Sequence, residues 1–94
     1  MLSNQDKKTL RGIAQNTHAL VQVGKDGVTL NLIKDLQVAL EAHELVKVKL
    51  LKTCPALVKE VALDLSAASR SEIVHIIGRV IVLYKRSKEN KLGL

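Results

Sequence analysis

The residues with the clearest chemical potential in this sequence are two glycines three positions apart, in Gly24-Lys25-Asp26-Gly27. An apolar run, 19–23, precedes them, and a segment with helical spacing, 30–40, follows them. Glycine has no Cβ, so the backbone at such a junction can approach a ligand closely. The first turn of the following helix offers free N–H groups and the positive end of the helix dipole, and Lys25 adds a mobile cation. This pattern predicts a site for phosphate groups, although the same residues also suit a tight turn with positive φ at one glycine.

Basic residues are concentrated in the second half of the chain. The 94 residues carry a formal net charge of +6. Residues 45–94 hold ten of the 15 basic residues and four of the nine acidic ones, whereas residues 1–44 are balanced. This asymmetry indicates an anionic partner, such as nucleic acid or an acidic membrane, or else a surface tuned for solubility.

Three of these basic residues could extend a phosphate site. Segment 45–50 alternates apolar and cationic residues, so Lys47 and Lys49 share one face of the strand that it predicts. These two lysines form either a cationic strip or an ordinary solvated strand face. Arg79 lies in a predicted turn, where it contacts a phosphate or only supplies turn polarity.

The C-terminal end of the chain is also basic. Lys85 and Arg86 close the last apolar run, and two more lysines follow within residues 87–94. Clusters of this kind strengthen nonspecific binding to anionic backbones. Because residues 87–94 are mostly polar, we expect them to form a flexible basic tail.

Composition limits the class of protein. With 94 residues, of which 47% are hydrophobic, the chain is large enough for one globular domain spanning 1–94. It has no apolar run approaching the roughly 20 residues that span a bilayer, and its polar N-terminus has no signal-peptide core. Cys54 is the only cysteine, which excludes an intrachain disulfide and a cysteine-based metal site. We therefore expect a cytoplasmic protein without a metal or another cofactor.

The side chains also argue against catalysis and against base stacking. Hydrolytic chemistry needs a nucleophile with a base, paired carboxylates or a metal, and the carboxylates here are scattered over predicted helix surfaces. We therefore expect no enzyme and no small-molecule substrate.

Tyr84 is the only Phe, Tyr or Trp residue, and its alternation with Val82 and Val80 predicts packing on a sheet. A nucleic-acid partner would then be recognised by backbone and shape, with little sequence preference.

Helical and strand periodicities alternate along the chain. Helices are predicted over 4–15, over 30–40 and from Pro55 to a break at 69–71; strands are predicted over 19–23, 45–50, 72–77 and 80–86. The last two strands form a hairpin around Gly78-Arg79, and their apolar character indicates central strands or strands covered on both faces. The fold class is therefore α/β in the order α-β-α-β-α-β-β, with a four-stranded mixed sheet and three helices.

Three strings in this order resemble the stand-alone YhbY-type CRM (chloroplast RNA splicing and ribosome maturation) domain. They are Gly24-Lys25-Asp26-Gly27, the string Ala39-Leu40-Glu41-Ala42-His43-Glu44-Leu45-Val46-Lys47-Val48-Lys49, and Ile77-Gly78-Arg79-Val80-Ile81-Val82-Leu83-Tyr84-Lys85-Arg86. Arg79 and Lys85 keep a cation where the family often has Lys and Arg. The resemblance implies a fold similar to the C-terminal domain of bacterial translation initiation factor 3. It also implies RNA binding and association with precursors of the large ribosomal subunit.

The resulting hypothesis is a monomeric, non-catalytic RNA-binding protein that assists assembly of the large ribosomal subunit. Its partner would be ribosomal RNA, held by a glycine loop of the kind with which KH domains clamp a nucleic-acid backbone. The alternative is an adaptor that docks on a ribosomal protein or assembly factor. A membrane partner is disfavoured, because no amphipathic helix carries Trp or Phe anchors. The predicted RNA-binding residues are Gly24, Lys25, Asp26, Gly27, Lys47, Lys49, Arg79, Lys85 and Arg86.

Overall fold

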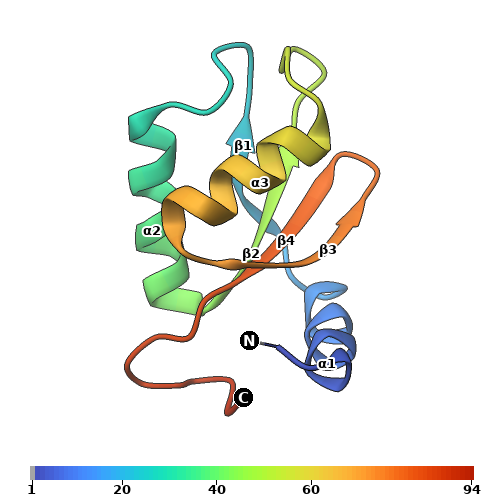
Figure 1. Cartoon of the computed structure of the whole chain (residues 1–94), viewed down its shortest axis with the longest axis vertical. Coiled ribbons are helices and arrows are strands. Elements are labelled where there is room, and N and C mark those ends of the chain that lie inside the picture. Colours follow the sequence, from blue (N-terminus) through green and yellow to red (C-terminus); the bar gives the residue numbers. More distant parts are fainter. Residues whose placement is uncertain (1) are drawn as a thin grey trace.

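A four-stranded mixed sheet forms the centre of the computed structural model, which describes residues 2–94 (Figure 1). Three helices pack on this sheet, in the chain order that the sequence predicts. The elements are α1 (Asn4–Ala14), β1 (Ala19–Val23), α2 (Leu30–His43), β2 (Leu45–Leu50), α3 (Val58–Ser69), β3 (Glu72–Ile77) and β4 (Val80–Tyr84).

The strands lie in the order β1-β2-β4-β3. β1 pairs with β2 in parallel, as expected for a β-α-β crossover through α2. β4 pairs antiparallel with both β2 and β3. The predicted mixed sheet is therefore confirmed, and β4 is a central strand while β3 lies at an edge. β3 can still be apolar on both faces, because α3 packs on one of its faces and α1 on the other.

The two faces of the sheet are covered unequally. Helices α2 and α3 bury one face, where Leu36 and Leu65 belong to the same core cluster as Val46, Val48 and Ile81. Helix α1 covers part of the other face through Leu10 and Ala14, which pack with a cluster of strand residues, namely Leu45, Val74, Val82 and Tyr84. The remainder of this second face is open, and Lys49 on it is exposed.

Local signals explain where the helices begin. The Ser3 side chain accepts a hydrogen bond from the Asp6 amide and the Asp6 carboxylate accepts one from the Ser3 amide, so Ser3 and Asp6 form a reciprocal capping box at the start of α1. Thr29 caps α2 by accepting a hydrogen bond from the Leu32 amide. The expected start of the third helix at Pro55 is wrong: α3 begins at Val58, and Pro55 lies in the preceding loop.

Residues 87–94 fold back onto the body of the protein, whereas the sequence predicts a flexible tail. Glu44, which is fully buried at the end of α2, is the centre of this contact. Its carboxylate accepts hydrogen bonds from the tail donors Ser87 N (3.0 Å), Ser87 Oγ, Lys91 N (2.9 Å) and Leu92 N (2.9 Å). Burial alone would raise the pKa of the Glu44 carboxyl, but the hydrogen bonds outweigh burial and lower the pKa to about 2.

Candidate nucleic-acid interface

Three connecting segments meet at one end of the sheet, which we call the loop end. They are the glycine loop (24–29), the loop between β2 and α3 (51–57) and the β3–β4 turn at Gly78-Arg79. Figure 1 shows the first two as neighbouring loops beyond the ends of β1 and β2. Their adjacency follows from the parallel pairing of β1 with β2, because parallel strands end at the same edge of a sheet.

The glycine loop is a tight turn with one left-handed glycine. The Gly27 amide donates to the Gly24 carbonyl at 3.0 Å, and Gly27 has a φ of 64°. Gly24 needs no such conformation, but a Cβ placed on it would lie 3.7 Å from Leu51 Cδ1 and 3.8 Å from Thr53 Oγ1. Gly27 therefore serves the turn, and Gly24 faces the neighbouring loop.

The start of α2 offers backbone donors beside this turn. Residues in the first turn of a helix have no intrahelical acceptor for their amides, and only the Leu32 amide is satisfied by the Thr29 cap. The first turn of α2 contains no acidic side chain to compete for these donors. Lys25 and Asp26 are both exposed at the tip of the loop. The loop end can therefore present amides and a cation to an anion, with Asp26 as an opposing charge.

Arg79 stabilises the neighbouring loop through its side chain. Its Nε donates to the Leu50 carbonyl at 3.1 Å, and its Nη2 donates to the Leu51 carbonyl at 2.6 Å. A guanidinium has five N–H donors, so the remaining donors are free to meet a phosphate. Arg79 thus lies in the β3–β4 turn, as predicted, and it has a positioning role that the sequence does not reveal.

Two more exposed lysines lie at the loop end. Lys49 is exposed on the open face of the sheet, one residue before β2 ends. Lys52, in the loop between β2 and α3, is exposed and was not among the residues predicted from the sequence. The available signal was its position two residues after β2, because β1, the parallel partner of β2, leads into the glycine loop at the same edge of the sheet.

Lys47 does not form a cationic strip with Lys49, which was one of the two interpretations that their spacing allowed. The two lysines share a face of β2, but Lys47 is half-buried beneath α1 and its Nζ donates to the Ala14 carbonyl at 3.0 Å. The lysine therefore neutralises the negative end of the α1 dipole. Only Lys49 of this pair is fully available at the surface.

Lys85 and Arg86 lie at the opposite end of the sheet, which we call the tail end. Antiparallel pairing of β2 with β4 sets Tyr84 opposite Leu45, whereas Val80 is opposite Lys49. Six residues of strand separate the two ends, or roughly 17 Å at the usual strand rise. Arg86 also donates to the Leu94 carbonyl. The predicted residues therefore do not form one compact patch.

Tyr84 is buried in the cluster beneath α1, which confirms that it packs on the sheet.

Among residues 2–94, no group of three or more His, Cys, Asp or Glu side chains is arranged to hold a metal ion. The helices of the described part of the chain are all too short or too polar to cross a bilayer.

Comparisons with known proteins agree with this architecture. A model of the CRS1 / YhbY (CRM) domain matches residues 2–85. The Bacillus subtilis (strain 168) "Probable RNA-binding protein YqeI" is 48% identical over 91 residues, covering 97% of this chain and 95% of the relative. A Haemophilus influenzae "RNA-binding protein" is 32% identical over 97 residues, covering 99% and 94%. The solution structure of the hypothetical protein SAV1595 from Staphylococcus aureus has a TM-score of 0.83 and 44% identity, covering 98% of this chain and 96% of that one.

The fold and the loop geometry define a small α/β domain with a strand–glycine loop–helix junction at one end of its sheet. With the match over residues 2–85, the chain belongs to the CRS1/YhbY (CRM) domain family.

Proposed function

We propose that this protein is a non-catalytic RNA-binding protein that holds the RNA backbone at its loop end. The observation that carries the proposal is the adjacency of two loops with exposed lysines, Lys25 and Lys52, beside the start of α2. Backbone amides and mobile cations are the donors that bind phosphate groups without reading sequence. The names of the relatives from Bacillus subtilis and Haemophilus influenzae support RNA as the ligand.

The proposed partner is ribosomal RNA in a precursor of the large ribosomal subunit, bound by a cytoplasmic monomer that assists assembly. The proposal of ribosomal RNA and of a role in assembly rests on the resemblance of the sequence to YhbY-type CRM domains. The cations proposed to meet phosphates are Lys25, Lys49, Lys52 and Arg79. The more distant Lys85 and Arg86 would add only long-range attraction, because they lie at the tail end.

Salt dependence is the experiment that tests this function. Four phosphate contacts on a single strand should give a slope of log K against log salt of roughly −3, at about 0.7 per contact. Lys25→Glu should weaken binding roughly three- to tenfold and flatten the slope. Lys88→Glu is the matched control, since it makes the same charge change at an exposed position of the tail. Equal losses in both variants would show attraction to net charge alone, and a slope near zero would reject the proposal.

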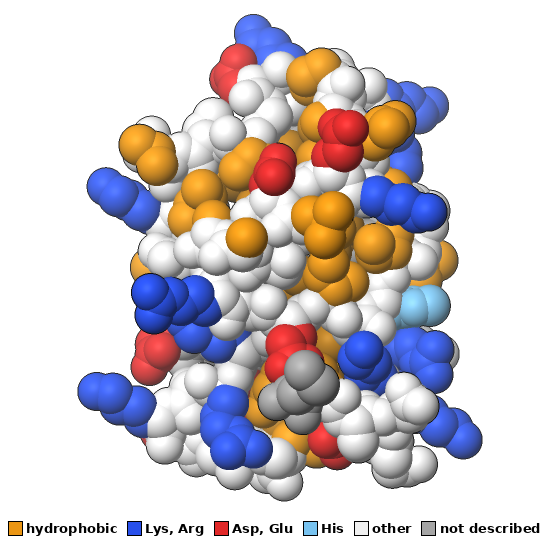
Figure 2. All heavy atoms as spheres, viewed as in Figure 1, with side chains coloured by type: hydrophobic (Ala, Val, Ile, Leu, Met, Phe, Trp, Pro, Cys, Tyr) orange, Lys and Arg blue, Asp and Glu red, His pale blue; other side chains and the backbone are white. Residues whose placement is uncertain are grey.

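A protein-docking function is the second candidate, and one observation favours it. Large apolar side chains are exposed on the helical layer, including Val38 on α2 (71% exposed) and Leu63 on α3 (63% exposed). Figure 2, which views this layer, shows hydrophobic side chains gathered between charged ones. An adaptor would retain its protein partner after nuclease treatment and at high salt, whereas the RNA-binding function predicts loss under both conditions.

A further inference from the structure

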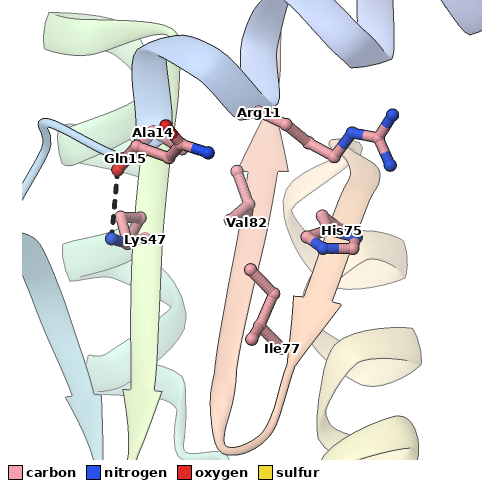
Figure 3. Close-up of a pocket in the computed structure, with 7 residues that line it drawn as sticks. All are labelled: Arg11, Ala14, Gln15, Lys47, His75, Ile77 and Val82. Atoms are coloured by element: carbon pink, nitrogen blue, oxygen red, sulfur yellow. Dashed lines mark hydrogen bonds between the residues drawn. The ribbon is translucent and has the colours of Figure 1, made fainter.

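A cavity of about 320 Å³ lies on the open face of the sheet, under the C-terminal turn of α1 (Figure 3). It is separate from the glycine loop. Its floor comes from β4 and β3, and its rim comes from α1, β2 and β3. The residues that matter here are Arg11, Gln15, Lys47, His75, Ile77 and Val82.

The cavity combines an apolar floor with a cationic rim. Val82 is buried in the floor, while Ile77 is 59% exposed, which leaves a large apolar side chain without cover. Arg11 reaches from α1 toward the strand that carries His75 (Figure 3). Among residues 2–94, no acidic side chain lines this cavity. Its lining therefore fits an occupant with an apolar part and an attached anion.

Several rim donors are unused. Within residues 2–94, neither the Arg11 guanidinium nor the His75 imidazole has a hydrogen-bond or ion-pair partner. Lys47 uses one of its three N–H donors in the hydrogen bond to the Ala14 carbonyl, which leaves two. That bond also neutralises the helix C-terminus, which would otherwise repel an anion at this place. The amide of Gln15 can both donate and accept, as the edge of a nucleobase requires.

A β-bulge helps to form the cavity. Ile73 pairs with Leu83 and His75 pairs with Val82, so two steps along β3 match one step along β4. Val74 consequently packs under α1, and the next residue, His75, still lines the cavity on the same face. Bulges redirect side chains in this way and are frequent beside functional sites.

One row of exposed or half-buried sheet residues connects the cavity to the β3–β4 turn of the loop end. Lys47, Val82 and His75 form one row across the strands, and the next row consists of Lys49, Val80 and Ile77. That second row leads directly to the Gly78-Arg79 turn. An RNA strand held at the loop end can therefore extend over Lys49 and reach the cavity along the open face.

We propose that this cavity binds one unpaired base of the RNA, with its phosphate at Arg11. The inference rests on the proposed RNA-binding function and adds a base contact to it. The volume, near the lower limit for ligand sites, suits a single base. A base in a duplex cannot enter, so single-stranded RNA is the substrate class. The base would lie on Ile77 and Val82 and beside the His75 ring, where the sequence suggested reading of backbone and shape alone.

The test compares two labelled probes of equal length and charge, an oligouridylate of about 12 nucleotides and the corresponding abasic ribose-phosphate oligomer. The unmodified protein should bind the oligouridylate about fivefold more tightly, a value at the low end for contacts to a base. The double variant His75→Ser, Ile77→Ser should bind both probes equally. Leu63→Ser is the matched control, since it removes an exposed apolar side chain from the other layer and should preserve the preference.

The outcomes separate this inference from the proposed function. Equal binding of both probes by the unmodified protein, with Lys25→Glu weakening both, rejects the cavity and leaves the loop end standing. A preference that persists in the double variant places the base elsewhere and also rejects the cavity. Absence of salt-sensitive binding to either probe rejects both proposals. Binding of labelled oligoglutamate that depends on His75 and Ile77, without a base preference, would assign the cavity to an acidic protein partner instead. Thermal unfolding confirms that each variant is folded.

Discussion

The guanidinium Nη2 of Arg79 lies 2.6 Å from the carbonyl oxygen of Leu51. With the bond from Nε to Leu50, it joins the β3–β4 turn to the loop that follows β2. Lysine cannot reproduce this fork, because its ammonium is a single point donor on a flexible stem. The loop end is thus held by a residue that the sequence suggested only as a phosphate contact or as turn polarity.

Arg79→Lys should therefore loosen the 51–57 loop while keeping the charge. We expect faster hydrogen exchange at the Cys54 amide, which donates to the Leu51 carbonyl, and a loss of about 1 kcal/mol in the free energy of unfolding. Hydrogen exchange measured by NMR checks the Cys54 amide, and urea unfolding checks the free energy of unfolding. If exchange in this loop matched the unmodified protein, the two side-chain hydrogen bonds would have no positioning role.

The two glycines of the loop should respond differently to alanine. Gly27 has a φ of 64°, so Gly27→Ala should cost about 1 kcal/mol of stability, and Gly27→Asn should cost less. Gly24→Ala meets only ordinary contacts and should leave the unfolding midpoint unchanged. If RNA approaches the backbone here, Gly24→Ala should nevertheless weaken binding. Unfolding curves and RNA titrations on the same variants measure both effects, and unchanged affinity for Gly24→Ala would exclude close approach at that residue.

The fold was largely predictable because burial follows local periodicity. Segments 19–23 and 45–50 form strands with the predicted bounds, and the hairpin turns at Gly78-Arg79. The prediction that the third helix starts at Pro55 was wrong because the fixed φ of proline is compatible with a loop as well as with a first helical turn. β3 was ambiguous because an edge strand covered by helices on both faces has the same apolar pattern as a central strand.

The candidate site was less predictable because side-chain partners depend on tertiary placement. Nothing local to Lys47 indicates that its ammonium meets the Ala14 carbonyl, 33 residues earlier in the chain. The separation of Lys85 from the glycine loop follows from strand order, which the sequence leaves open. The cavity depends on a bulge at Val74, and no glycine or other turn residue marks that bulge in the sequence.

Lys47 and Lys49 should contribute differently to the stability of the fold. Lys47→Met removes the cation at the end of α1 and should lower stability by about 0.5–1 kcal/mol. Lys49→Met removes an exposed cation and should leave stability unchanged while flattening the salt dependence of RNA binding by about 0.7. Parallel urea unfolding and RNA titrations in several salt concentrations check the pair. If Lys49→Met lowered stability and Lys47→Met did not, the bond from Lys47 Nζ to the Ala14 carbonyl would not stabilise α1.

The contact between the Glu44 carboxylate and residues 87–94 should depend on pH. Glu44 ends α2 with a φ of 65°, an uncommon conformation for a residue with a side chain, and its pKa is lowered from 4.5 to about 2. A carboxyl whose pKa is lower in the folded state stabilises the fold above its unfolded pKa. That stabilisation should therefore be complete above pH 4.5 and should be lost progressively as the pH falls toward about 2.

Protection of the Ser87 and Lys91 amides, followed by NMR from neutral pH downward, should report this loss. Glu44→Gln should release the tail already at neutral pH, because an amide presents one acceptor oxygen where the carboxylate presents two. Asp64→Asn, at an exposed carboxylate of α3, is the matched control and should retain the transition. Tail amides that stay protected below pH 2 in the unmodified protein would show that the apolar contacts of Leu92 hold the tail without the carboxylate.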